Sequence, residues 1–304
     1  MAKTGLNAPQ FQDADKARQY LEAQVWPNGP TCPHCGVIGK HWELVGKTTR
    51  PGLYKCTDCR EPFTVTVGTV FERSKIPLNK WLMAVYLLCS SKKGMSSHQL
   101  HRTLGVTYKT AWFMTHRIRK AMETRKPEPM GGKGKIVEAD ETYWGQIKGQ
   151  PKKAGGWTKH KIVSLVERGG ESRSFHVPFV TAVDVRRVLR NNVARDTQLM
   201  TDENHVYDKV GREFLSHETV VHSRKEYVRG NVHTNTAESF FNILKRGLIG
   251  TYHHVGEQHL QKYVSEFDFR YNNRTALGVT DAERSDKALK GIAGKRLTYR
   301  RINA

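Results

Sequence analysis

The sequence is short of acidic residues, of long apolar runs and of cysteine. Its 304 residues contain 29 Asp and Glu against 50 Lys and Arg, which leaves a formal net charge of +21 and an isoelectric point of about 9.9. The longest apolar run, Trp81 to Cys89, has nine residues, whereas a helix that crosses a bilayer needs about 20. The sequence therefore predicts no membrane span. The charge excess favours a polyanionic partner, with nucleic acid ahead of an anionic membrane surface.

Other absences narrow the class of protein further. The N-terminal stretch carries acidic residues and has no apolar core, unlike a secretory signal or a transit peptide, so we expect a cytoplasmic protein. Five cysteines are too few for a disulfide scaffold. Widespread disorder is excluded because 38% of the residues are hydrophobic and 9% are aromatic, and the length allows two or three domains.

Four of the five cysteines form two CxxC pairs. Cys32 and Cys35 are separated by 20 residues from Cys56 and Cys59, and each pair of thiolates can hold one face of a tetrahedral zinc ion. The pattern predicts a zinc ribbon over residues 29–68, with one structural Zn²⁺ and a strand over 63–67. Four thiolates leave no position open for water, so we expect no catalysis at this metal. The basic residues around the second pair fit two interpretations equally well, which are contact with DNA and a basic surface exposed to solvent.

Helical patterns flank the ribbon. The spacing predicts a leading helix over 11–25, within residues 1–28, and a helical module over 75–123. A helix-turn-helix motif has a helix N-cap, a turn and a second N-cap in that order. The sequence offers Ser96 or Ser97 for the first cap, Gly105 for the turn and Thr107 for the second cap. The second helix carries Tyr108, Lys109, Thr110, Arg117, Arg119 and Lys120, which predicts DNA contact. A plain three-helix packing module is the alternative, and Cys89 is expected to be a buried apolar residue.

The remaining chain changes pattern. Residues 124–135 contain two prolines and three glycines and are predicted to be a linker. Strands are predicted at 136–143, 161–168, 173–179, 197–201 and 219–222, with helices at 181–194, 236–246 and 257–272. This α/β order over 136–275 resembles the ribonuclease-H-like fold of retroviral integrases. We expect a basic loop over 144–161, with Trp157 stacking on DNA, and a basic C-terminal tail over 276–304 in which Lys295, Arg296, Arg300 and Arg301 track phosphates.

Three carboxylates occupy positions where they can converge. Asp140 lies in the first of these strands, Asp202 ends another, and Glu238 begins a helix, with 35 residues between it and Asp202. Such a set can hold two Mg²⁺ or Mn²⁺ ions, one of which activates a water or 3′-hydroxyl while the other stabilises the leaving oxygen in phosphoryl transfer. Glu138 shares a strand face with Asp140 and is a rival ligand. Glu141 and Glu203 are expected to point away.

In combination, these motifs resemble the DDE-type insertion-sequence transposases with an N-terminal zinc ribbon, the ISXO-like group, over residues 11–275. The resemblance rests on the 35-residue spacing, on a basic residue seven positions after Glu238, and on the stretches that begin at His233 and at Tyr252. It implies that Lys245 engages DNA near the active site. Relatives are described with either Asn or Glu as the third catalytic residue. We expect Glu238 to be that residue here, with Asn235 as a secondary ligand or positioning group.

The resemblance also implies an activity and its partners. We expect a bacterial, nucleoid-associated DNA transposase that binds the terminal inverted repeats of its element as double-stranded DNA, cleaves strands with metal ions and joins them to target DNA. A homodimer or larger assembly on DNA follows, because two ends must be held together. The alternatives are a ribonuclease-H-like nuclease or resolvase without strand transfer, and a non-catalytic zinc-ribbon DNA-binding regulator.

Overall fold

A computed structural model describes residues 5–124, 127–149 and 158–298. The chain divides into two compact units, one of residues 1–123 with 275–304 and one of residues 124–274. Within the described ranges, no helix is long and apolar enough to span a bilayer. Residues 150–157, among them Trp157 of the predicted basic loop, lie outside the described residues, as do Arg300 and Arg301.

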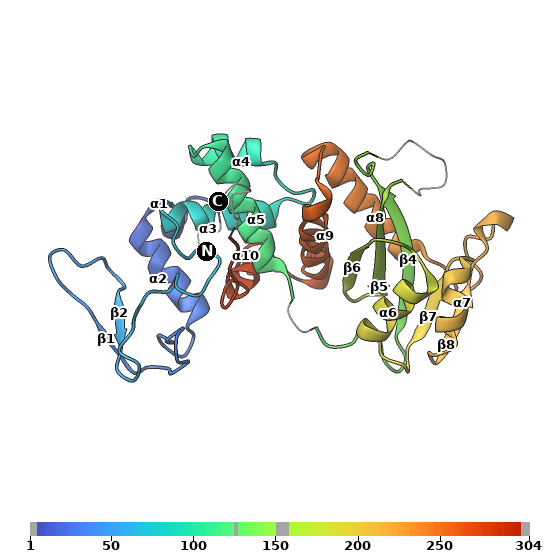
Figure 1. Ribbon diagram of the computed structural model, residues 1–304, viewed down its shortest axis with the longest axis horizontal. Coiled ribbons are helices and arrows are strands. Elements are labelled where there is room, and N and C mark those ends of the chain that lie inside the picture. The colour runs from blue at the N-terminus through green and yellow to red at the C-terminus, as the bar shows by residue number, and fades with distance from the viewer. Residues whose placement is uncertain (1–4, 125–126, 150–157, 299–304) are drawn as a thin grey trace. The chain divides into compact units, whose positions relative to one another are not determined.

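The first unit is built from helices of both ends of the chain (Figure 1). They are α1 (Pro9–Gln12), α2 (Ala14–Val25), α3 (Leu78–Ser90), α4 (Ser97–Leu104), α5 (Tyr108–Met122) and α10 (Asp281–Lys290). The predicted leading helix is thus two helices, broken at Asp13. The Asp13 carboxylate accepts hydrogen bonds from the backbone N–H groups of Asp15 and Lys16, at 2.9 and 2.8 Å, and so caps α2. Cys89 is fully buried, as predicted.

The helix-turn-helix pattern is confirmed in its caps and turn. Ser96 accepts a hydrogen bond from the backbone N–H of Gln99 at 3.1 Å, and Thr107 accepts one from Thr110 at 3.2 Å. Gly105, between the two helices, has a φ of 60°, which a residue without a Cβ adopts readily. The sequence therefore placed α4 and α5 correctly.

Two of the expected DNA contacts on α5 are wrong. Arg117 is 8% exposed and donates to the carbonyl of Glu72 at 3.0 Å, and Arg119 is 1% exposed and donates to the Thr115 hydroxyl at 3.0 Å. Both are buried on α5, which packs against α3, α4 and α10. Tyr108 and Lys109, at the exposed start of the helix, keep the position that the motif predicts for base or phosphate contacts.

The predicted basic tail contains a packed helix, α10. A capping box between Thr280 and Glu283 starts α10, which packs against α3 and α2 and buries Ala288 and Leu289. Lys295 is 7% exposed, and its ammonium donates to the carbonyl of Ala121 at 2.7 Å. The expectation that Lys295 tracks phosphates is therefore wrong, because its charge serves to bind the end of α5.

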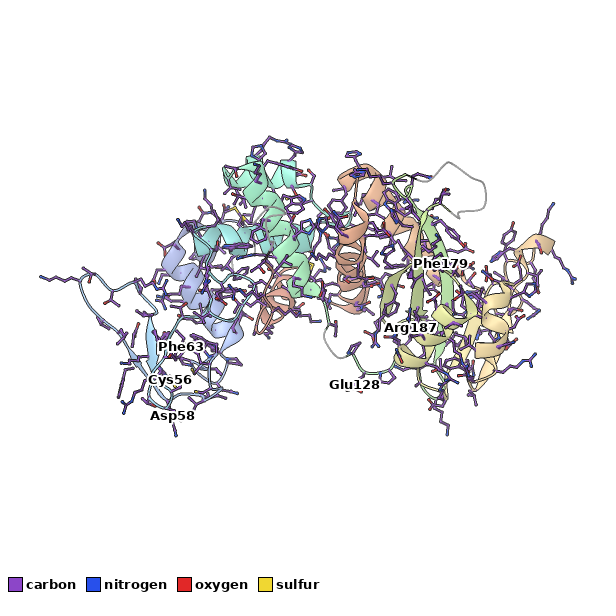
Figure 2. All side chains as sticks on the ribbon, in the orientation of Figure 1. Cys56, Asp58, Phe63, Glu128, Phe179 and Arg187 are labelled. Carbon is purple, nitrogen blue, oxygen red and sulfur yellow. The ribbon has the colours of Figure 1, made fainter. Side chains whose placement is uncertain are left out.

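The cysteine-rich segment forms a three-stranded antiparallel sheet of β1 (His41–Glu43), β2 (Tyr54–Cys56) and β3 (Pro62–Phe63), in that order. The strand predicted over 63–67 is wrong beyond Phe63. The backbone turns there, with the N–H of Val67 donating to the carbonyl of Thr64 at 3.0 Å, and burial does not alternate. Figure 2 shows Cys56 and Phe63 in this small core, which also contains Cys32 and Tyr54.

The second unit contains a five-stranded sheet in the order β6-β5-β4-β7-β8. Its strands are β4 (Ile136–Trp144), β5 (His160–Glu167), β6 (Ser172–Val177), β7 (Gln198–Thr201) and β8 (Ser216–Thr219). Strands β4, β5 and β6 pair antiparallel, whereas β7 and β8 continue parallel to β4. The strands agree with prediction within a few residues. The exception is the last, since β8 ends where the predicted strand 219–222 begins.

Helices cover both faces of this sheet (Figure 1). On one face, α6 (Ala182–Asn192) packs on Val137, Ala139 and Leu165, with η2 (His205–Tyr207) and α7 (Asp208–Gly211) beside it. On the other face, α8 (Asn235–Gly247) and α9 (Glu257–Asn272) pack on Ile162 and Val166. A π-helical turn, Leu248–Tyr252, extends α8. Because strand side chains alternate, Glu138 and Asp140 lie on the α8 side.

Two predicted loop segments contribute to this unit. Met130, inside the predicted linker, is 1% exposed in the α6 core and bridges to Val193. Lys161, which we predicted to be in the basic loop, lies in β5 and is 7% exposed. The segment around it therefore offers fewer cations to DNA than the sequence indicated, because the second hairpin strand begins at His160.

Candidate active site and metal centre

The four ribbon cysteines form one cluster. Cys32 Sγ lies 3.6 Å from Cys59 Sγ, and Cys35 Sγ lies 3.6 Å from Cys56 Sγ. These separations are too long for a disulfide, whose sulfurs lie about 2 Å apart, and they match tetrahedral ligands at about 2.3 Å from a zinc ion. All four ligand atoms lie within 4.8 Å of one another. The quartet therefore fits a structural zinc ion.

Strand register aligns the first two predicted catalytic carboxylates. Parallel pairing matches Glu138 of β4 with Met200 of β7, so the same register, continued two residues on, places Asp140 opposite Asp202. Glu238 lies in the first turn of α8, which covers that face of the sheet. The structure thus brings the three acids to one edge of the β4–β7 pair.

The other acids of the cluster act electrostatically on Asp140. Burial is the largest cause that raises the pKa of Asp140, to about 8, and the negative charges of Asp202, Glu141 and Glu238 raise it further. Burial also raises the pKa of Asp202. Like charges in a partly buried site repel one another, and a divalent cation with oxygen ligands would relieve that repulsion. The donor set therefore fits Mg²⁺ or Mn²⁺.

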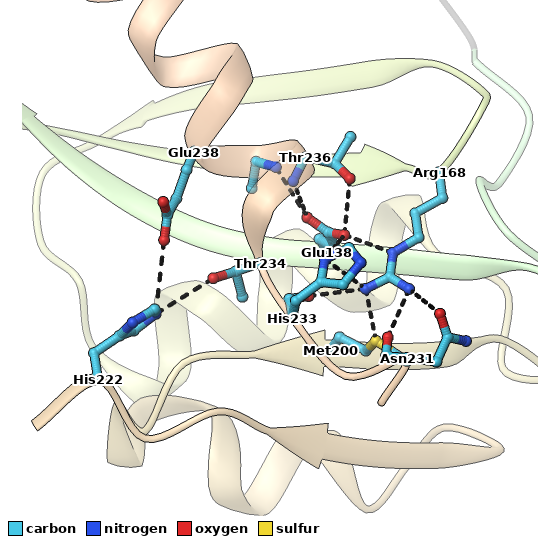
Figure 3. A network of polar contacts seen from close by, with 10 residues as sticks. Glu138, Arg168, Met200, His222, Asn231, His233, Thr234, Thr236 and Glu238 are labelled. Carbon is cyan, nitrogen blue, oxygen red and sulfur yellow. Dashed lines mark hydrogen bonds and ion pairs between the residues drawn. The ribbon is translucent and has the colours of Figure 1, made fainter. Parts of the chain in front are cut away.

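Glu138 has another role than the rival ligand that the strand pattern suggested. Its carboxylate is fully buried and accepts hydrogen bonds from the backbone N–H groups of Thr236 and Ala237, at 2.8 and 2.9 Å. It also accepts one from Arg168 Nε at 2.6 Å (Figure 3). These donors occupy both oxygens, and the negative charge lies at the N-terminus of α8, where the helix dipole favours it. Glu138 therefore fixes the helix that carries Glu238.

Arg168 is a residue that sequence reasoning missed. Its guanidinium joins the loop before α8 to the sheet, because it donates to the carbonyls of Asn231 and His233 at 2.8 and 2.9 Å as well as to Glu138. The sequence held only an indirect signal for it, the prediction that Glu138 shares a strand face with Asp140. A buried carboxylate requires a partner cation, and Arg168 follows the neighbouring strand.

His222 is the second missed residue. Its Nε2 lies 3.7 Å from Glu238 Oε1 and 3.4 Å from the Thr234 hydroxyl (Figure 3), and its charge lowers the pKa of Asp202. It follows β8 in a short 3₁₀ turn. The sequence placed residue 222 at a strand end and gave no reason to single it out. The pairing of β8 with β7, which brings the end of β8 close to Asp202, was not predicted.

Two further acids have hydrogen-bond partners outside this cluster, and two residues of α8 lie near the two ends of that helix. Glu141 lies on the opposite strand face, where it accepts a hydrogen bond from the Tyr207 hydroxyl at 2.8 Å, and Glu203 accepts one from the backbone N–H of His222 at 2.8 Å. Asn235 is exposed at the first position of α8. Lys245, two turns after Glu238, lies in the last turn of α8 on the same helix face.

Comparison with known proteins agrees with this arrangement. Residues 131–272 match the model of the ISXO2-like transposase domain, and residues 12–61 match that of the transposase zinc-ribbon domain. The chain is also similar to a protein of Halobacterium salinarum described as an uncharacterized protein in transposable element ISH50. The two are 30% identical over 283 residues, which cover 86% of this chain and 91% of the relative. With its ribbon, its sheet and its acidic edge, the chain belongs to the ISXO2-like transposases of insertion sequences.

Proposed function

We propose that this protein is a DDE transposase that binds the ends of its element and catalyses metal-dependent DNA strand cleavage and strand transfer. The observation that carries the proposal is the convergence of Asp140, Asp202 and Glu238 at one sheet edge, where burial raises the pKa of Asp140 and the negative charges of Asp202 and Glu238 raise it further. The order β6-β5-β4-β7-β8, with antiparallel and then parallel pairing, supports a ribonuclease-H-like fold for the catalytic unit.

Each acidic residue has a distinct position for this chemistry. Asp140 and Asp202 are held by paired strands, and Glu238 by a helix whose first turn is capped by Glu138. We propose that these three carboxylates hold two divalent cations, which would activate the attacking water or 3′-hydroxyl and stabilise the leaving oxygen. His222, whose Nε2 lies 3.7 Å from Glu238 Oε1, would hold that carboxylate electrostatically. No covalent intermediate on the protein is required.

The DNA would be held by basic residues outside this edge. Lys245 shares a face of α8 with Glu238 and would contact phosphates next to the cleaved bond. The zinc ribbon and the start of α5 would bind the element ends, and the net charge of +21 supports phosphate contact in general. Because two ends must be cut and joined, we propose a dimer or larger assembly on DNA.

The test uses end-labelled DNA with the element termini. The full chain is incubated with and without Mg²⁺, in buffer without chelator so that zinc stays bound. Asp202→Asn is compared with Asp208→Asn, which changes a carboxylate that is 53% exposed and lies outside the cluster. We expect nicked and joined products with Mg²⁺ for the wild type and for Asp208→Asn, and none for Asp202→Asn.

Three results would change the conclusion. Cleavage without joined products would indicate a nuclease or resolvase. Binding without cleavage under every condition would leave a DNA-binding regulator. Undiminished activity of Asp202→Asn would place the chemistry elsewhere. A parallel comparison of Glu238→Gln and Asn235→Ala decides the third ligand, since we expect loss of cleavage only from the first.

A further inference from the structure

A second group of metal-ligating side chains lies on the sheet, separate from the carboxylates. It consists of His160 at the start of β5, His176 near the end of β6 and Glu257 at the start of α9. Their ligand atoms all lie within 4.8 Å of one another. His160 pairs in register with Trp144 of β4, four residues and therefore about 13 Å along that strand from Asp140. The group is thus distinct from the acidic edge.

The fold itself brings these three residues together. Antiparallel pairing matches Ile162 of β5 with His176 of β6, so His160 lies two residues beyond that pair on the same sheet face. This face is covered by α9, whose Asp268 accepts a hydrogen bond from the Ser174 hydroxyl at 2.8 Å. Glu257 is the first residue of that helix, which places its carboxylate over the two imidazoles.

His160 has a buried nitrogen that nothing in the described part of the chain satisfies. Its side chain is 6% exposed, and its Nδ1 makes no hydrogen bond there. The nearest carboxylate oxygen, Glu257 Oε1, is 4.0 Å away, which is beyond hydrogen-bonding distance. Buried polar atoms are nearly always paired because an unpaired one costs free energy. An unpaired nitrogen that faces a second imidazole and a carboxylate points to a ligand between them.

Both imidazoles are suited to bind a cation. Their ring centres lie 5.5 Å apart at an interplanar angle of 74°, so the rings converge instead of stacking. Burial lowers the pKa of His160 and of His176, which keeps both rings neutral near pH 7. Neutral imidazole is the form that coordinates metals. Mg²⁺ prefers oxygen ligands, whereas two imidazoles with one carboxylate suit Zn²⁺ and its first-row neighbours.

We propose that His160, His176 and Glu257 form a second zinc-class site that joins α9 to the β5–β6 edge. Tetrahedral ligands at about 2.0 to 2.1 Å from zinc lie about 3.4 Å apart, so the group must contract slightly. Glu257 permits that movement because its side chain is 58% exposed. The site adjoins the base of the hairpin, where the backbone N–H of Ile147 donates to the carbonyl of Thr158 at 2.8 Å. Zinc would fix the base of the hairpin to the start of α9.

Zinc counting tests the proposal. The full chain carries Asp202→Asn throughout, so that the acidic edge adds no metal, and the bound zinc is measured by mass spectrometry after dialysis. We expect about two zinc ions per chain, one of them in the ribbon, and about one when His160→Gln, His176→Gln or Glu257→Gln is added. His205→Gln, at a histidine that is 95% exposed, is the matched control and keeps both ions.

Two outcomes would overturn the proposal. The first is a count of only one zinc ion per chain in the parent chain with Asp202→Asn alone. The second is a count of two zinc ions per chain that is unchanged by both His160→Gln and Glu257→Gln. Glu257→Gln keeps the test decisive where a buried histidine variant fails to fold, because the exposed Glu257 has no core role. A second readout is melting temperature, since added zinc should raise that of the parent chain more than that of Glu257→Gln.

Discussion

The buried carboxylate of Glu138 yields the sharpest test of how this site is held. Replacing Glu138 by Ala removes the acceptor of two backbone N–H groups of α8 and of the Thr236 hydroxyl, and it leaves Arg168 without its charged partner. Breaking one side of a buried ion pair costs about 3 to 5 kcal/mol, because the remaining charge stays desolvated. Arg168 is 17% exposed, so most of that cost applies. We expect Glu138→Ala to destabilise the second unit by about 4 kcal/mol.

Differential scanning calorimetry of the full chain measures this effect. For a unit of about 150 residues, 4 kcal/mol corresponds to a decrease in melting temperature of about 10 °C. Glu218→Ala, which truncates a glutamate that is 51% exposed, is the matched control and should cost less than about 1 kcal/mol. The double variant Glu138→Ala, Arg168→Ala should lose less than the sum of the two single losses, because neither charge is then left alone.

A melting temperature of Glu138→Ala within about 2 °C of the wild type would refute this role of Glu138. Were Glu138 a metal ligand instead, its loss would weaken Mg²⁺ binding and leave the melting temperature without Mg²⁺ unchanged. Hydrogen exchange distinguishes the two roles in a second way. The amides of Thr236 and Ala237 should lose protection in Glu138→Ala, since they donate directly to the removed carboxylate.

Three further predictions concern the acidic edge, the ribbon and the start of the second unit. Asp202→Asn should raise the melting temperature in Mg²⁺-free buffer, because it removes a charge that raises the pKa of Asp140; a decrease would show that this repulsion does not destabilise the fold. Cys56→Ser should abolish zinc binding by the ribbon and unfold it, whereas Cys89→Ala, outside the quartet, should keep the zinc. Gly131→Ala should destabilise by about 2 kcal/mol or more, since a Cβ there would lie 2.2 Å from the Thr197 hydroxyl oxygen at a φ of +80°. Gly134→Ala, with a φ of +77° and open space around it, should cost only the backbone strain, about 1 kcal/mol; equal losses would refute the clash.

Local rules were enough for much of this protein. The caps at Ser96 and Thr107 and the turn at Gly105 depend on residues three or four positions apart. Strands and helices of the second unit follow from hydrophobic periods of 2 and 3.6 residues, which a sequence displays directly. The two CxxC pairs and the 35-residue spacing between Asp202 and Glu238 are also readable without coordinates.

Tertiary structure decided the features that depend on partners far along the chain. Glu138 and Asp140 look alike on one strand face, and only the arrival of α8, 98 residues later, pairs one of them with backbone amides and leaves the other beside Asp202. The burial of Arg119 likewise required α5 to be surrounded by helices from both ends of the chain.

The same holds for the group of His160, His176 and Glu257. It has no sequence spacing that a reader would recognise, since strand register and the start of α9 create it. A sequence specifies periodicity and local hydrogen bonds, which act over a few residues. Which side chains then meet across a sheet depends on register and on helix placement, and a one-residue slip in register would reverse every strand face.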